Sequence, residues 1–233
     1  MRPGPATLRA VPMFERLDGK LLGQLDAITE LHGFDVNAEL CRQGAIPAVL
    51  HVLLDGQVAL SGTAPDETQA VMEVLRPIAC FVLAAVLTEQ PYLMTATATT
   101  EVRVLTINAP ALRALIRTEH DLALALLGTA ARDFRSMVRQ IRDLKLRSAT
   151  QRLGCYLLAL VNDPAATSAQ FRLPFDKALL AGRLGCRQDS LSRAFAALRG
   201  LGVETHGSAV VLHDVARLRA FAMPDELTDT PVI

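Results

Sequence analysis

The sequence predicts an α+β protein with a β-rich N-terminal domain, a long central helix and a helical C-terminal domain. Three observations support this prediction. Short runs rich in Val, Leu and Thr alternate with turn residues from 33 to 107. A stretch without Gly or Pro follows, from 129 to 153. Beyond it, two short amphipathic segments flank Gly185, which is typical of a helix-turn-helix.

The first 118 residues are expected to form a helix, a β domain and a second helix. Residues 12–31 carry apolar residues at helical spacing, and Asp18 can cap that helix. The predicted strands are 50–54, 57–61, 70–75, 94–100 and 102–107. Short strands at such intervals favour a small barrel or sandwich. Asp55-Gly56 indicates a β-hairpin, and Asn108-Ala109-Pro110 opens a helix that runs to 118.

The long helix is expected to run from about Asp121 to Arg147. Its apolar residues alternate at spacings of 3 and 4, and we call them the apolar stripe: Leu127, Ala130, Phe134, Met137, Ile141 and Leu144. This alternation is the a/d pattern of a coiled coil, in which two helices bury their apolar faces together. One interpretation is a helix that packs on its own domain, and the other is a dimerisation helix. The domains on both sides favour dimerisation.

The C-terminal part reads as a winged helix-turn-helix. The helix is expected to continue from Ser148 to Leu160 and to end at Asn162-Asp163-Pro164, before a brief extended piece at 171–174. Asp176 to Gly202 then holds two helices, with the turn at Gly185. The buried residues expected are Ala178, Leu179, Ala181 and Leu184 in the first helix and Leu191, Phe195 and Leu198 in the second. VETHGSAVVLHD (203–214) reads as a two-stranded wing, and 217–221 as a last helical turn.

Composition excludes several classes of protein. A chain of 233 residues is long enough for two domains. Net charge is zero, but Ser148 to Phe221 holds nine Lys/Arg against five Asp/Glu, and residues 224–230 form an acidic tail. The longest apolar run, Ile78–Leu87, is about half of a membrane span, and no signal core precedes the first domain. No enzyme motif is present. We therefore expect a cytoplasmic protein that is neither an enzyme nor bound to a membrane.

The order of these elements resembles the cyclic-AMP receptor/fumarate–nitrate regulator (CRP/FNR) family of bacterial transcription factors, from about Phe14 to Phe221. The matching motifs are RQGAIP (42–47), LLDGQVAL (53–60) and AGRLGCRQDSLSRAFAAL (181–198), the last being similar to the family's "LG.s.ET.SR.l..L" pattern. Within the family, DLALALL (121–127), SATQRL (148–153) and YLLAL (156–160) resemble the nitric-oxide-responsive nitrate-respiration regulators.

The resemblance implies a three-part organisation. A cyclic-nucleotide-binding-like β-roll would occupy 1–118, a dimerisation helix 119–147, and a winged helix-turn-helix 148–233. It also implies a homodimer that binds palindromic double-stranded DNA and works with RNA polymerase. A signal in the β-roll would change the packing of the long helices and so the orientation of the two DNA-binding domains.

The second helix of the helix-turn-helix carries the side chains that can read DNA. Such a helix presents polar residues from its N-terminal half to base edges in the major groove. The predicted contacts with base edges are Gln188, Asp189, Ser192 and Arg193, whereas Arg187 and Lys177 are expected on phosphate. Arg193 can pair with guanine and Asp189 can accept from cytosine. The resemblance places the family's Glu-x-x-Ser-Arg readers on Asp189, Ser192 and Arg193, so that Asp stands for Glu here. Arg183 and Arg199 are further phosphate candidates.

The first domain departs from the family members that bind cyclic AMP. Those members carry a Gly-Glu pair and then an Arg-Ser pair that hold ribose and phosphate. This chain has Leu83-Ala84-Ala85 and Pro91–Thr95 at the corresponding places. An anionic nucleotide buried there without a cation would be unfavourable by several kcal/mol. The sequence therefore argues against a cyclic nucleotide as effector, and it also lacks the N-terminal cysteine cluster of the iron–sulfur oxygen sensors.

An apolar pocket facing the long helix is expected instead. Its predicted residues are Phe81, Val82, Leu83, Val86, Leu87, Tyr92, Leu93 and Met94. It is either a filled core without a ligand or a site for haem or another flat apolar ligand, as the nitric-oxide-responsive relatives imply. The candidate axial ligands are His32, His51, His120, Cys41, Cys80 and Met94. The four cysteines form no Cys-x-x-Cys pair and fit reduced thiols. Cys186 is either a packing residue or an oxidation switch.

Overall fold

The computed structural model describes residues 1–163, 165–173 and 177–225. The chain divides into two compact units, Met1–Phe134 and Arg135–Ile233. Four predicted features fall partly outside the described residues: the stop at Pro164, the end of the extended piece at Pro174, the start of the helix-turn-helix at Asp176, and most of the acidic tail (226–230). The predicted domain boundaries at 118/119 and 147/148 stay predictions.

The helices of the N-terminal unit are α1 (Pro5–Arg9), α2 (Gly19–Ala27), α3 (Leu83–Thr88) and α4 (Ala109–Thr118). The Asp18 carboxylate accepts from the Leu21 amide and the Asn108 side chain from the Ala111 amide, so both predicted caps are confirmed. The predicted helix 12–31 is too long at both ends. Residues 12–17 form turns, and from Thr29 the chain is extended because it pairs with a neighbouring strand.

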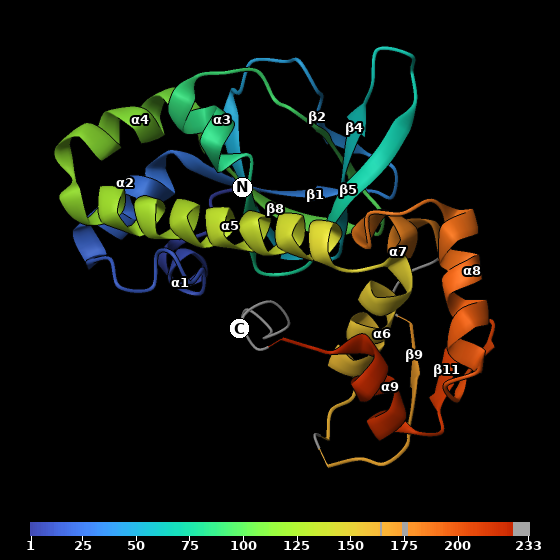
Figure 1. Ribbon diagram of the computed structural model, residues 1–233. Helices are drawn as coiled ribbons and strands as arrows, with labels where there is room; N and C mark the ends of the chain where they lie inside the picture. The colour runs from blue at the N-terminus through green and yellow to red at the C-terminus, as the bar shows by residue number, and fades with distance from the viewer. Residues whose placement is uncertain (164, 174–176, 226–233) are drawn as a thin grey trace. The chain divides into compact units, whose positions relative to one another are not determined.

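Two four-stranded antiparallel sheets form the β domain (Figure 1). One has the order β1-β8-β3-β6, from Thr29–Phe34, Val102–Asn108, Val49–Asp55 and Ala79–Phe81. The other has the order β2-β7-β4-β5, from Glu39–Cys41, Thr95–Ala98, Val58–Thr63 and Gln69–Leu75. All five predicted strands are present, and β1, β2 and β6 were not predicted.

The hairpin predicted at Asp55-Gly56 is wrong. The turn exists, but β3 pairs with β6 and β8 whereas β4 pairs with β5 and β7. The turn therefore carries the chain from one sheet to the other. Gly56 has φ +84°, and a Cβ there would collide with the backbone oxygen of Glu101. Glycine is required here for both conformation and space.

The residues of β3 face two different cores. Leu50 and Val52 pack with α1, α2, α4 and the start of α5, whereas Leu53 packs with Val58, Val104 and Tyr92 between the sheets. Alternate residues of a strand point to opposite faces, which accounts for the division. In Figure 1, α1, α2 and α4 gather with the start of α5 at one end of the sheets.

Helix α5 is a single element, His120–Leu146, as the sequence predicts. It does not continue into the next helix. Helix α6 (Ala149–Ala159) begins anew at Ser148, which forms a capping box with Gln151. The capping box satisfies two otherwise unpaired amides at the helix start, so the long helix stops and restarts at this point.

The C-terminal unit is a winged helix-turn-helix. Helices α7 (Lys177–Arg183) and α8 (Gln188–Arg199) are joined by a turn in which Gly185 has φ +59°. Strands β10 (Val203–His206) and β11 (Ala209–Leu212) form the wing, and β9 (Ala169–Arg172) pairs with β11. Helix α9 (Val215–Ala222) is longer than predicted. In α7 the buried residues are Leu180 and Ala181, whereas Ala178 is exposed.

Candidate DNA-binding and effector sites

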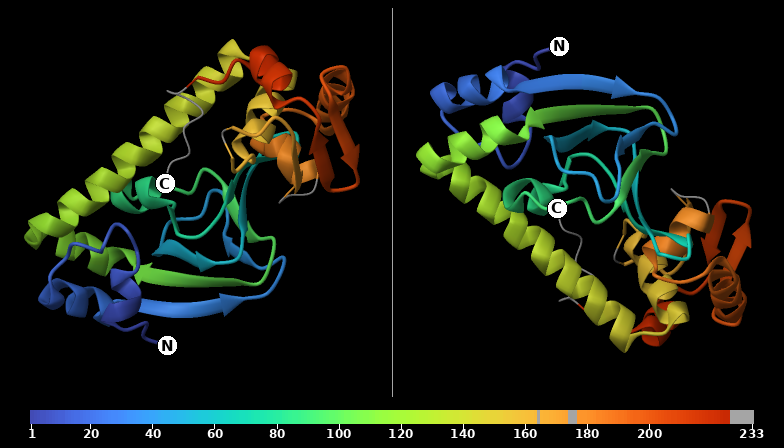
Figure 2. Two further views of the ribbon diagram at one scale, coloured as in Figure 1. Left: turned by 90° about the horizontal axis from the view of Figure 1, so that it is seen from below. Right: turned by 90° about the horizontal axis from the view of Figure 1, so that it is seen from above.

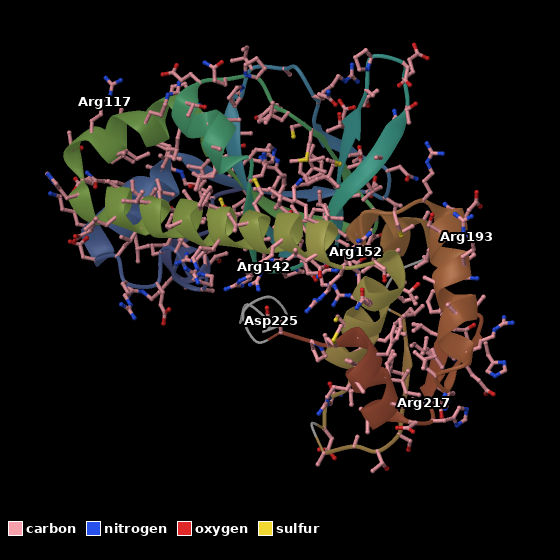
Figure 3. The ribbon with its side chains drawn as sticks, in the orientation of Figure 1. Arg117, Arg142, Arg152, Arg193, Arg217 and Asp225 are labelled. Carbon is pink, nitrogen blue, oxygen red and sulfur yellow. The ribbon has the colours of Figure 1, made fainter. Side chains whose placement is uncertain are left out.

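Helix α8 separates apolar and polar residues on opposite faces. Leu191, Ala194, Phe195 and Leu198 are buried. The residues of this region that are predicted to contact DNA are all exposed: Arg187, Gln188, Asp189, Ser192 and Arg193. A guanidinium nitrogen of Arg193 lies 3.2 Å from the Ser190 hydroxyl, one turn earlier, and Figure 3 shows the Arg193 side chain pointing away from the helix. The face that would meet a major groove is therefore free of core contacts.

The wing lies beside this helix in both views of Figure 2, and β10 contacts α8. Its two strands pair antiparallel, with His206-Gly207-Ser208 at the tip, as predicted. Glu204 lies 3.2 Å from the His213 ring nitrogen and 3.8 Å from that of His206. The hydrogen bond from His213 lowers the pKa of the Glu204 carboxyl. Lys177, the predicted phosphate contact, is exposed at the start of α7.

The apolar stripe on α5 is largely uncovered in the single chain. Leu127, Phe134, Met137, Ile141 and Leu144 each expose between 47% and 65% of their surface. Ala130 differs, since it packs partly against the core of its own unit. Three further exposed apolar residues of α5 were not included in the predicted stripe: Leu124, Val138 and Leu146. Neighbouring exposed apolar residues are typical of interaction sites.

The predicted effector pocket is not one cluster. Leu83, Val86 and Leu87 belong to the core that holds the helices. Phe81, Val82, Tyr92 and Met94 belong to the core between the sheets.

Leu93 is a wrong prediction, because its side chain is 84% exposed. Tyr92 exchanges backbone hydrogen bonds with Gly44 and Ala45, which holds this segment extended. Side chains alternate along extended chain, so Tyr92 points into the core and Leu93 points to solvent.

Of the six candidate axial ligands for haem, His51 fits best. Its side chain stacks on Phe81 with 5.0 Å between ring centroids, and the residue is only 2% exposed. Its Nδ1 has no hydrogen-bond partner among the described residues, while the Leu40 backbone oxygen bonds to the ring. Burial lowers the pKa of His51 to about 4. A neutral imidazole held by a carbonyl on one nitrogen, with a bare lone pair on the other, is the arrangement that metal-ligating histidines adopt.

Four of the other candidates, His120, His32, Cys41 and Cys80, fit less well. His120 is exposed, and the His32 ring nitrogen Nε2 lies 2.9 Å from the Glu30 carboxylate. Burial raises the pKa of the Cys41 thiol to about 11 and also raises that of Cys80. These thiols are therefore poor sources of the thiolate that binds iron.

Comparison with known proteins fits this architecture. The family model of the cyclic nucleotide-binding domain matches residues 32–119, and that of the Crp-like helix-turn-helix domain matches residues 151–221. One similar crystal structure is that of a Ruegeria pomeroyi protein described as a cyclic nucleotide binding protein. The two sequences are 30% identical, the match covers 95% of this chain and 97% of the Ruegeria chain, and the TM-score is 0.61. The chain belongs to the CRP/FNR family of transcription regulators. DNR from Pseudomonas aeruginosa is 27% identical over 95% of this chain and 98% of its own, with a TM-score of 0.51.

A curated relative of this CRP/FNR regulator is the CRP-like cAMP-activated global transcriptional regulator of Mycobacterium tuberculosis. It is 24% identical over 173 residues, which are 72% of this chain and 77% of the relative. In the CRP/FNR regulator described here, however, Leu83 of α3 is buried where a ribose-binding pair is expected. The described part of the chain contains no helix that is both long and apolar enough to cross a membrane.

One buried residue of this CRP/FNR regulator was missed by the sequence reasoning. Arg152 lies in α6, exposes only 8% of its surface and bonds to the turn between α7 and α8. The hint in the sequence is an arginine directly before the largely apolar run LGCYLLAL (153–160).

Proposed function

We propose that this chain works in the cytoplasm as a homodimeric regulator that binds palindromic DNA and acts together with RNA polymerase. Each α8 would read one half-site, and the two half-sites would lie about 34 Å apart, one helical turn of DNA. The observation that carries the proposal is the exposed apolar stripe on α5, because it offers a self-complementary surface in a chain that also exposes a base-reading helix. A two-fold dimer matches a two-fold DNA site.

Selection of duplexes from a random library by the purified full-length protein tests this proposal. We expect an enriched inverted repeat with half-site centres one turn apart, and a dimer by analytical ultracentrifugation. Enrichment of a single unrepeated motif, or a monomer at the concentration that binds DNA, would contradict it.

The proposed effector is a small neutral molecule such as nitric oxide, or a redox signal, rather than a cyclic nucleotide. Leu83 is buried where the ribose-binding pair is expected, and residues 91–95, at the place of the phosphate-binding pair, include no cation, so an anionic nucleotide would lack a counter-charge there. His51 supports haem as the receptor of nitric oxide, since a bound haem would supply an iron atom that takes up the gas. The role of His51 would be to hold the iron through Nδ1.

Absorption spectra of the protein reconstituted with haem, with and without nitric oxide, test this choice of effector. We expect a Soret band that shifts on addition of the gas, and we expect His51→Ala to lose the wild-type band position. His120→Ala is the matched control, because His120 is exposed, and it should keep the wild-type spectrum. Tighter DNA binding on addition of cyclic AMP, with no spectral change from haem, would favour an atypical cyclic-nucleotide pocket instead.

A further inference from the structure

Arg152 joins the end of α5 to the turn of the helix-turn-helix. Its guanidinium donates three hydrogen bonds to backbone oxygens: Nε to Leu184 at 2.8 Å, Nη1 to Arg147 at 2.7 Å and Nη2 to Gly185 at 3.4 Å. Arg147 follows the last residue of α5, and Leu184 and Gly185 form the turn before α8. Figure 3 shows Arg152 on α6. One buried side chain therefore connects three elements.

Leu144 holds the same turn from a second direction. A Cβ at Gly185 would collide with the Leu144 side chain, and Gly185 also has φ +59°. The Leu144 side chain, from the last turn of α5, thus packs directly against the backbone of the turn that precedes α8. Leu144 is at the same time 47% exposed and part of the apolar stripe.

Further polar contacts fix the chain near the end of α5. Arg147 forms an ion pair with Asp143 at 2.9 Å and donates to the Met223 oxygen at 3.1 Å. Arg142 forms an ion pair with Asp225 at 2.8 Å, and Figure 3 shows the two side by side. The segment that follows α9 is therefore attached to α5 as well.

A buried arginine is an unfavourable way to fill space. Removing a cation from water costs free energy that hydrogen bonds only offset when their geometry is good, and an apolar residue of similar volume often gives equal or greater stability. The guanidinium instead fixes the relative orientation of the segments that it bonds to, because its planar array of donors holds the three backbone oxygens at set angles. The contacts of Arg152 are thus suited to orientation more than to stability.

We infer that Arg152 is a positioning residue for DNA recognition. Together with Leu144 it fixes the direction of α8 relative to the last turns of α5, and in the dimer this sets the half-site spacing that two α8 helices can read together. The inference rests on the proposed function. Because Arg152 is buried, it reads no base, and its effect is on spacing rather than on base choice.

The test uses duplexes selected by the wild-type protein and variants of them in which the half-sites are one base pair closer or farther apart. We expect the wild type to lose at least about tenfold in affinity on either change, since one base pair rotates and shifts a half-site. Arg152→Met and Arg152→Lys should bind all three duplexes within about threefold, because neither side chain reproduces the planar donor array. Arg219→Met is the matched control, since Arg219 is exposed in α9, and should keep the wild-type preference.

The affinities for half-sites with single base substitutions provide an internal comparison, because they measure base preference separately from the preference for half-site spacing. Both Arg152 variants should keep the wild-type preference among point-substituted half-sites, because Arg193 is untouched. Variants that are less stable to heat but retain the wild-type spacing preference would reduce Arg152 to a structural role and overturn the inference. A wild type without any spacing preference would contradict the proposed dimer instead.

A second measurement needs no DNA. The Cys186 amide donates to the Ala181 oxygen at 2.9 Å within the same turn, so its hydrogen exchange reports on the order of the turn. We expect this exchange to be at least about tenfold faster in Arg152→Met than in the wild type, with unchanged exchange in β10 and β11. Equal exchange rates at Cys186 in a folded variant would overturn the inference.

Discussion

At the scale of single residues, Arg193 is the side chain on which base discrimination should depend most. It is exposed on α8, and a bidentate arginine–guanine pair contributes about 1–3 kcal/mol of discrimination. We expect Arg193→Ala to lower the preference for the selected duplex over a scrambled duplex by at least about tenfold while the dimer stays intact. Competition titrations followed by fluorescence anisotropy measure this preference.

Arg199→Ala is the control for that experiment. Arg199 is also exposed on α8, but in its last turn, where a phosphate contact is expected. Its loss should weaken binding to both duplexes alike, because phosphate contacts carry no base information. Unchanged discrimination in Arg193→Ala would reject Arg193 as a base reader.

His51 links pH to the stability of the N-terminal unit. Burial lowers its pKa from 6.5 to about 4, so below pH 6.5 the unfolded chain binds a proton that the folded chain does not. The contribution of neutral, buried His51 to the free energy of unfolding is therefore complete above pH 6.5 and is lost as the pH falls toward 4. We expect the free energy of unfolding to be about 2 kcal/mol lower at pH 5 than at pH 8 from this group alone.

Urea unfolding at the two pH values, compared between variants, isolates that effect. His51→Leu should lose about 2 kcal/mol of the pH dependence, whereas His120→Leu should keep it, since His120 is exposed. An identical pH dependence in wild type and His51→Leu would show that the His51 ring is not held neutral by burial.

The residue scale also shows what sequence patterns can and cannot locate. The exposed face of α8 was predictable because helical periodicity decides which side chains face out, and Leu191 and Phe195 are buried as the pattern requires. Arg152 was not predictable, because its three acceptors are backbone oxygens, and two of them lie more than 30 residues away. Hydrogen bonds to distant backbone leave no trace in spacing or composition.

At the scale of elements, α5 carries the prediction with the largest expected effect. A carboxylate placed in the apolar stripe would be buried without a partner in the dimer, at a cost of several kcal/mol. We expect Phe134→Glu to raise the dimer dissociation constant at least about 100-fold, with DNA affinity falling to the non-specific level. Sedimentation velocity across a concentration series measures the dissociation constant.

Ser136→Glu is the matched control, because it adds the same side chain to the same helix outside the apolar stripe. It should sediment as the wild type does. A dimer that persists in Phe134→Glu at wild-type strength would refute the apolar stripe as the dimer interface.

Strands were easier to predict than their pairing. Each predicted strand lies within two residues of an observed one because β-branched runs between turn residues are local signals. Which strands pair depends on long-range contacts, so the turn at Asp55-Gly56 was read as a hairpin although its strands belong to different sheets. Helix α3 was missed for a related reason. It is short and is flanked by Val82 and Glu89, two non-glycine residues with positive φ, a conformation that sequence does not indicate.

At the scale of the whole molecule, the order of the parts was predictable and the effector site was not. The β-rich, helical and winged segments differ in periodicity over tens of residues, which is enough to recognise each one. The predicted pocket joined residues that are neighbours in sequence, from Phe81 to Met94, but these divide between two cores. Local apolar sequence identifies buried residues without showing which buried cluster they join.

The charge distribution of the chain makes a last prediction. Net charge is zero, so attraction to DNA has to come from the C-terminal unit, where Lys177, Arg187 and Arg199 are exposed. If each subunit makes three phosphate contacts, the logarithm of the binding constant should fall with the logarithm of salt concentration at a slope of about −5.

Lys177→Ala removes one contact per subunit and should reduce the steepness of this slope by about 2. Lys20→Ala, at an exposed position of α2, should leave it unchanged. Titrations at several salt concentrations between about 50 and 200 mM measure the slope. A slope near zero would mean that these cations do not contact phosphate, because released counterions are the source of the salt dependence.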